Sequence, residues 1–224
     1  ARITDTLFVW DYTQNWHAFQ GPHPNYFVLQ PNIRFFRDQG VQGVFEQAAH
    51  SPGADAEYLK AWIIGRALWN PDLDGEALYH EFMDLYYREA APFLKEYHRL
   101  LLEKIAASEY ALTIFSEMEW MDAAMVRKAE AVFERAFAAV SDETIRARLE
   151  RAYLPVQYAA LVCPPEIEIT EDRYIMRRPD ALSLEEYFAR LETYDVTHLE
   201  DRPIEAFRER LQGKTPPRYR EIPF

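Results

Sequence analysis

Two carboxylates near the start of the chain stand at the ends of short apolar runs. Asp11 lies near the end of the run Leu7–Tyr12, and Glu46 directly follows the run Val41–Phe45. Acidic side chains at the carboxyl ends of neighbouring parallel strands can reach the separation that an acid/base pair needs to cleave a glycosidic bond. We therefore identify Asp11 and Glu46 as candidate catalytic residues.

Polar and aromatic side chains surround these two acids in the sequence. Aromatic rings provide flat apolar walls for a sugar ring, and amide and imidazole groups form hydrogen bonds with its hydroxyls. The candidate substrate-binding residues are Trp10, Tyr12, Asn15, His23, Asn25 and Gln47, with Trp16, His17 and Phe19 in the same loop.

A structural role is the alternative for the same residues. Asp11 would then cap the loop that follows it, and Glu46 would form an ion pair with Arg34 or Arg66. A single histidine in a loop commonly serves as a hydrogen-bonding or solvated residue. The sequence alone leaves both interpretations open.

Other chemistries lack their motifs in this chain. There is no glycine-rich phosphate loop, no nucleophile elbow and no dinucleotide fingerprint. The six histidines do not show the spacing of a metalloprotease or a zinc finger, so we expect no metal and no cofactor. Cys163 is the single cysteine, which excludes an intrachain disulfide.

The charge balance narrows the classes of partner. The 224 residues include 25 basic and 37 acidic side chains, which give a formal net charge of −12. Such a surface repels phosphate backbones and anionic lipids, so we expect no nucleic acid and no membrane partner. No apolar run reaches the roughly 18 residues that span a bilayer. A hydrophobic content of 49% is nevertheless sufficient for a packed core.

The hydrophobic pattern places the two acids in a βαβ unit. Leu7–Tyr12 is a continuous apolar run, which is typical of a strand that is covered on both faces. Pro31 fits the first turn of a helix that continues to Arg37, and Val41–Phe45 predicts the next strand. Strand, helix and strand in this order predict a parallel pair with a right-handed crossover.

From Ala54 onward the apolar residues repeat at helical spacing, so the predicted fold class is mainly α with a short βαβ segment. Ser183 and Glu186 form a capping box at the start of a later helix. A small hairpin is predicted near residues 166–177, and the proline-rich tail from Lys214 is expected to be irregular.

Four short motifs resemble one known family. They are Trp10-Asp11-Tyr12, Pro22-His23-Pro24-Asn25, Gly43-Val44-Phe45-Glu46-Gln47 and Leu68-Trp69-Asn70-Pro71-Asp72. Their order and spacing resemble the bacterial proteins of the domain of unknown function 4838, over residues from about 5 to 200. The resemblance implies a relation to alpha-glucuronidases and beta-hexosaminidases, a (β/α)8 catalytic barrel and a periplasmic or extracellular location.

On this resemblance, residues 1–70 supply the last strands and helices of the barrel, and residues 71–224 form a helical C-terminal region. The family has no catalytic residues that can be carried over, so Asp11 and Glu46 are candidates from their position alone. A barrel needs eight strands and about 250 residues. We therefore expect the remainder of a longer polypeptide, or a partner in a homodimer, to complete the fold.

These expectations favour the C-terminal part of a glycoside hydrolase that acts on an oligo- or polysaccharide. Its main partner would be the carbohydrate substrate. The alternative is a non-catalytic helical module that binds carbohydrate or mediates subunit contacts. In the alternative, the loop aromatics serve recognition and neither acid affects turnover.

Overall fold

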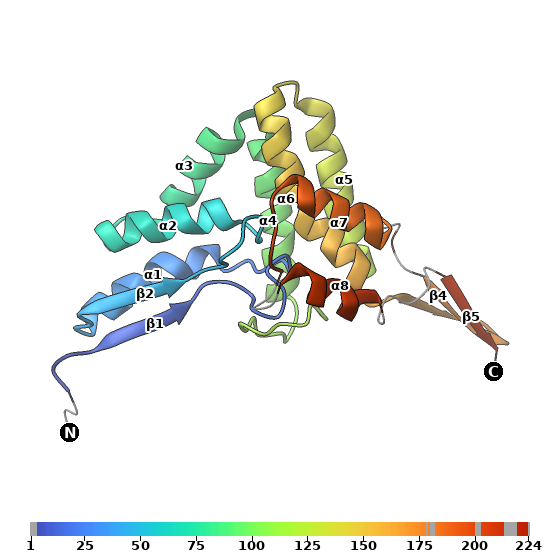
Figure 1. Cartoon of the computed structure of the whole chain (residues 1–224), viewed down its shortest axis with the longest axis horizontal. Helices are drawn as coiled ribbons and strands as arrows, with labels where there is room; N and C mark the ends of the chain where they lie inside the picture. Colours follow the sequence, from blue (N-terminus) through green and yellow to red (C-terminus); the bar gives the residue numbers. More distant parts are fainter. Residues whose placement is uncertain (1–3, 178, 180–181, 200–202, 213–218, 224) are drawn as a thin grey trace.

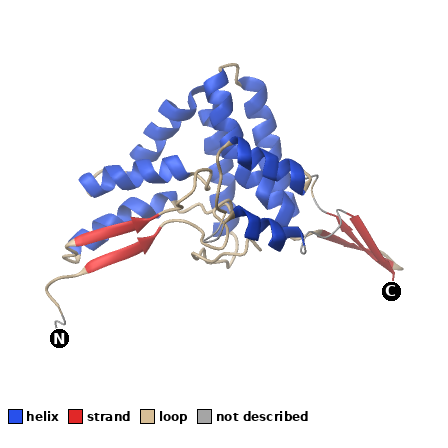
Figure 2. Ribbon diagram, in the orientation of Figure 1, coloured by secondary structure: helices blue, strands red, loops and turns tan. Residues whose placement is uncertain are grey.

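The computed structural model describes residues 4–177, 179, 182–199, 203–212 and 219–223. The protein is mainly helical, with a two-stranded sheet formed by N-terminal residues and a three-stranded sheet formed by C-terminal residues. Figure 1 and Figure 2 show the two sheets at opposite ends of the molecule, with the helices between them.

The N-terminal residues form the expected βαβ unit. It consists of β1 (Phe8–Tyr12), α1 (Tyr26–Asp38) and β2 (Gly43–Gln47). The two strands pair in parallel, which confirms the predicted pairing. The next helix, α2 (Glu57–Trp69), packs beside α1 (Figure 1).

The start of α1 differs from the expected one. The helix begins at Tyr26, so Pro31 lies inside it rather than in its first turn. Proline lacks the N–H that would bond to the carbonyl one turn back, and this loss costs stability inside a helix. Burial of Tyr26, Leu29 and Ile33 in the core offsets that cost, and local sequence rules do not include such tertiary contacts.

The remaining helices share one apolar core. They are α3 (Gly75–Tyr87), the 3-10 turn Arg88–Ala90, α4 (Ala91–Ala106), α5 (Ala123–Ala139), α6 (Glu143–Val162), α7 (Leu184–Thr193) and α8 (Ile204–Gln212). Fully buried rings in this core include Tyr97, Phe133 and Tyr187. The predicted capping box is confirmed, because Ser183 and Glu186 each accept a hydrogen bond from the other's backbone N–H.

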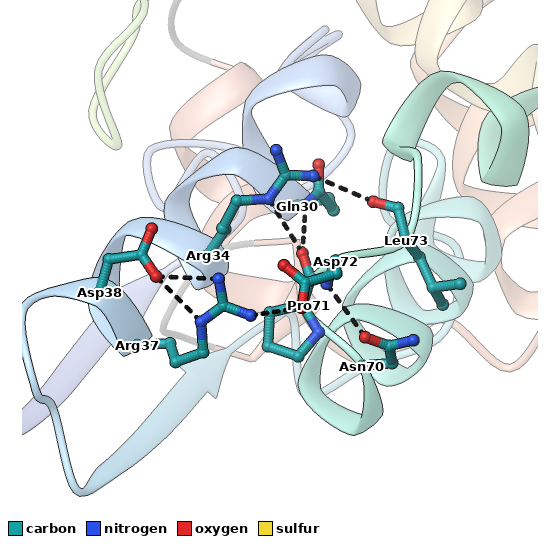
Figure 3. A network of polar contacts seen from close by, with 8 residues as sticks. All are labelled: Gln30, Arg34, Arg37, Asp38, Asn70, Pro71, Asp72 and Leu73. Carbon is teal, nitrogen blue, oxygen red and sulfur yellow. Dashed lines mark hydrogen bonds and ion pairs between the residues drawn. The ribbon is translucent and has the colours of Figure 1, made fainter.

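Polar contacts join α1 to the loop between α2 and α3. Arg34 donates to the carbonyls of Pro71 and Leu73 at 3.1 and 3.3 Å. Gln30 Nε2 also donates to Pro71 O, at 2.6 Å. Figure 3 shows these side chains converging on the loop. Within the motif Leu68–Asp72, Pro71 therefore has a structural role, since its carbonyl accepts hydrogen bonds from two side chains of α1.

Arg34→Ala is expected to destabilise the protein by about 1–3 kcal/mol, because two carbonyls lose a charged donor. Arg37→Ala is a matched control, since Arg37 lies on the same helix and forms exposed ion pairs with Asp38 and Asp72. Exposed pairs contribute about 0–1 kcal/mol. Urea unfolding of both variants measures the difference, and equal losses would contradict the role of Arg34.

The second sheet contains the predicted hairpin and one further strand. β3 (Glu166–Ile169) and β4 (Arg173–Arg177) pair antiparallel, which confirms the hairpin. β5 (Tyr219–Pro223) pairs antiparallel with β4, so the expectation of an irregular tail is wrong for these residues. The preceding tail residues, 214–218, lie outside the described residues. The proline content of this segment disfavours a strand, but it does not indicate whether a distant strand is available to pair with it.

One face of the β1–β2 sheet is open. Phe8 is 70% exposed, Trp10 63% and Phe45 55%. The expectation that the first strand is covered on both faces is therefore wrong within the part of the chain that the structure describes. A continuous apolar run shows that both faces favour contact with other side chains, but it does not show which segments provide that contact.

Candidate functional site

β1 and β2 bring the two candidate acids side by side. Asp11 and Glu46 are direct partners in the parallel register, so their side chains leave the same face of the sheet. Neighbouring strands lie about 4.8 Å apart. Both side chains are half-buried, and each stands one residue before the end of its strand. The predicted juxtaposition of the two acids is therefore present.

The Glu46 carboxyl group has an unusual environment. Its Oε1 atom is buried and has no hydrogen-bond partner among the described residues. Burial, with a smaller contribution from the charge of Asp11, raises the pKa of Glu46 to about 7. Arg34 donates to backbone carbonyls and Arg66 pairs with Glu81, so neither neutralises Glu46. The structural alternative of an ion pair with either arginine is therefore wrong.

The titration of Glu46 provides a direct test of this environment. We expect its carboxyl carbon to titrate in a 13C NMR experiment with a midpoint near pH 7. Asp11→Asn should lower the midpoint, because a like charge is lost. Between the ordinary glutamate pKa of 4.5 and this midpoint, the folded state holds a proton that the unfolded state has already released, so the contribution of Glu46 to stability falls as pH rises from 4.5 towards 7. A midpoint at the ordinary glutamate value would contradict the buried position.

The candidate aromatic contacts lie on the opposite face from the acids. Side chains alternate along a strand, so Trp10, Tyr12, Phe45 and Gln47 share the open face. The rings of Trp10 and Phe45 meet edge to face with centroids 4.9 Å apart, and Trp10 Nε1 donates to Gln47 Oε1 at 2.5 Å. A single sugar ring can contact this group and the acids only by lying across the ends of the strands.

The two asparagine side chains of the loop after β1 are engaged within the protein. Asn15 is buried, donates from Nδ2 to Ser116 O at 2.9 Å and accepts at Oδ1 from the His17 N–H. Asn25 Nδ2 donates to Thr13 O at 3.1 Å. These hydrogen bonds hold the loop in place and favour a structural role for both side chains.

His23 is also directed into the protein. Its backbone N–H donates to Asp55 Oδ2 at 3.0 Å, and its buried ring atom Nδ1 has no hydrogen-bond partner among the described residues. Burial, together with the nearby charge of Lys60, lowers the pKa of His23 to about 3. The imidazole is therefore neutral near physiological pH and is not suited to act as a general acid there.

Sequence patterns do not reveal a buried ion pair beneath the same loop. Lys60 and Asp55 are each 2% exposed, and their charged groups lie 3.4 Å apart. Lys60 Nζ also donates to Gln14 Oε1 at 2.6 Å, and Gln14 Nε2 donates to Asp55 O at 3.0 Å. Burial lowers the pKa of Lys60 to about 8, and the charge of Asp55 opposes that shift. The pair joins the loop after β1 to the start of α2.

Two further histidines meet near the carboxyl end of the same sheet. His50 follows β2 and His198 follows α7, and their ring centroids are 4.6 Å apart. Ser51 Oγ accepts from the N–H groups of Thr197 and His198 at 2.9 and 3.1 Å. Trp16 packs against His50 from the loop after β1. The 147 positions between Ser51 and His198 explain why sequence patterns miss this contact.

The described residues offer neither a metal-binding cluster nor a membrane-spanning helix. Within them, no group of three or more His, Cys, Asp or Glu side chains could hold a metal ion. None of the helices in the same part of the chain is long and apolar enough to cross a membrane.

The fold and the acid pair define a mainly helical protein whose short parallel sheet carries two adjacent carboxyl groups. Residues 1–99 match the family model described as Domain of unknown function (DUF4838). The match covers 99 of the 224 residues and includes all four motifs, whereas the expected similarity reached about residue 200. No curated protein and no solved structure matches the chain.

Proposed function

We propose that the chain forms the C-terminal part of a glycoside hydrolase that acts on an oligo- or polysaccharide. The observation that carries the proposal is the Asp11–Glu46 pair, in which Glu46 holds a proton close to neutral pH. Glycosidic cleavage needs a protonated acid for the leaving oxygen and an ionised partner as base or nucleophile. Glu46 takes the role of the acid in this proposal, and Asp11 takes that of the base or nucleophile.

The position of the pair supports this use. Ligand sites of parallel α/β sheets lie at the carboxyl ends of the strands, and both acids stand close to those ends. Tyr12 ends β1 and packs edge to face against Trp16 in the following loop. In the proposed complex the sugar lies across the strand ends, where the ring of Tyr12 and the two acids contact it from β1 and β2.

The open sheet supports a barrel as the complete architecture. Two strands alone are at best marginally stable in water, and parallel sheets are covered on both faces. Among the described residues, β1 and β2 pair only with each other, and their aromatic face is open. Residues 1–70 are proposed as the last strand–helix units of a (β/α)8 barrel, and residues 71–224 as a helical region. Further strands of the same polypeptide, or a second copy, would complete the sheet.

Hydrolysis of an aryl-glycoside panel tests the proposal. The natural full-length protein is incubated with para-nitrophenyl glycosides that differ in sugar and anomeric configuration, and the release of para-nitrophenol is measured. We expect turnover of at least one substrate near neutral pH, where Glu46 is still partly protonated. Absence of turnover with the entire panel and with oligosaccharides of the same sugars would contradict the proposal.

A carbohydrate-binding module is the second candidate, and a different observation favours it. The rings of Trp10 and Phe45 form an exposed aromatic surface, and a hydrogen bond to Gln47 fixes the orientation of Trp10. Such rings pack against sugar faces without a catalytic acid. Calorimetry with oligosaccharides distinguishes the candidates. Binding that persists when Asp11 and Glu46 are both replaced by their amides, but disappears in Trp10→Ala, favours the module.

A further inference from the structure

A hollow of ligand size lies on the helical region, between α5, α6 and α7. Its volume is about 450 Å³, and small-molecule sites commonly enclose about 300–1,000 Å³. Neither candidate acid of the β1–β2 sheet lines it. The side chains that matter for its chemistry are Phe137, Arg146, Glu150, Tyr153, Arg190 and Tyr194.

Three aromatic rings form the apolar walls of this groove. Phe137 and Tyr153 meet edge to face with centroids 5.8 Å apart. The hydroxyl of Tyr194 donates to Glu150 Oε2 at 2.8 Å, which fixes the end of α7 against α6. Packing between helices therefore positions the rings before any ligand arrives.

Two guanidinium groups lie beside these rings. Arg146 lies over Phe137 at 5.4 Å from the ring centroid and 3.7 Å from Glu150. Arg190 lies close enough to Tyr153 and Tyr194 for its charge to lower the pKa of both hydroxyls, although burial raises both to about 12. Within the described residues, the Arg190 guanidinium has no hydrogen-bond or ion-pair partner.

The charge of the lining differs in sign from that of the whole protein. Two arginines against one glutamate give the lining a net charge of +1, whereas the chain carries −12. The single acid, Glu150, already accepts the hydroxyl of Tyr194. Glu130 and Glu134 on α5 also act on Tyr153, but they do not line the groove. An unpaired guanidinium beside aromatic walls is suited to an anion attached to a ring.

We propose that this groove binds a small ligand that joins a flat ring to one anionic group, a carboxylate or a phosphate. The ring packs against Tyr153 and Tyr194, and Arg190 binds the anion with Arg146 as the second donor. Both anions match the planar donor fork of a guanidinium. The groove contributes binding and no catalytic step, and the inference does not depend on glycoside hydrolysis.

Calorimetric titration of the full chain with phenyl phosphate and with benzoate tests the proposal, and benzyl alcohol is the uncharged control. We expect saturable binding of at least one anion, weakened by added salt, and weaker or no binding of benzyl alcohol. Arg190→Ala should reduce the affinity for the anion about tenfold or more. Arg99→Ala, which removes an exposed arginine on α4, should leave the affinity unchanged.

Three results would overturn the proposal: no saturable binding of either anion, unchanged affinity in Arg190→Ala, or benzyl alcohol binding as tightly as the anions. Arg190 is exposed, so its loss should leave the thermal unfolding curve unchanged, and circular dichroism verifies this. Replacement of Asp11 and Glu46 by their amides should leave anion binding intact. The outcome is therefore separate from that of the glycosidase test.

Discussion

Glu46→Gln is expected to lower the turnover of a responsive glycoside by about 10²–10⁴-fold, which is the contribution of a positioned general acid. The substitution preserves the shape of the side chain and removes the proton that the carboxyl group holds up to about pH 7. The pH–rate profile of the wild-type protein should therefore lose activity above that pH. The residual activity of the Glu46→Gln variant should not show this decrease above pH 7, because the variant has no carboxyl group that titrates there.

Asp11→Asn should cause a comparable loss, because the reaction also needs an ionised partner. Its residual pH–rate profile should be displaced to lower pH, since the charge that helps to raise the pKa of Glu46 is gone. Glu103→Gln is the control, since Glu103 is exposed on α4 and pairs with Arg99. Unchanged rates in both site variants would end the catalytic assignment and leave the aromatic face of the sheet as the basis of function.

Lys60→Met is expected to lower the free energy of unfolding by about 3–5 kcal/mol, because it leaves a buried charge without its partner. Asp55 would lose the ammonium group that lies 3.4 Å away, and Gln14 Oε1 would lose its donor. Methionine has a similar length, so most of the packing is retained. The loss therefore reports on the charge rather than on a cavity.

A double variant separates the two contributions. Asp55→Asn combined with Lys60→Met removes both charges, so part of the loss should be recovered. Lys95→Met is the control, because its pair with Asp84 lies on the surface and contributes about 0–1 kcal/mol. Urea denaturation followed by circular dichroism gives the values. A loss in Lys60→Met no larger than that in Lys95→Met would show that the pair is not buried in solution.

Local signals account for the elements that the sequence predicts correctly. The βαβ unit follows from two apolar runs on either side of a helical stretch, and pairing of neighbouring segments requires no distant residue. The capping box of Ser183 and Glu186 depends on groups three residues apart. The hairpin of β3 and β4 has a short connection, so its strands meet at little entropic cost.

Elements that depend on distant contacts are the ones that local rules place wrongly. Pro31 suggests a helix start at its own position, but burial of Tyr26 extends α1 by five residues towards the N-terminus. β5 has three prolines in or near it, yet it pairs with β4 across more than 40 positions. In both cases a tertiary contact outweighs the local preference.

The position of Asp11 and Glu46 near the ends of neighbouring strands follows from the two apolar runs in the sequence. The separation of Asp11 from Trp10 and the chemistry of these groups follow from the folded structure. The raised pKa of Glu46 depends on the side chains that bury it. The buried ammonium group of Lys60 depends on its contacts with Asp55 and Gln14. The contact of His198 with His50 depends on the C-terminal region folding back onto the sheet. Desolvation and pairing depend on which segments meet in space, and spacing along the chain does not encode those meetings.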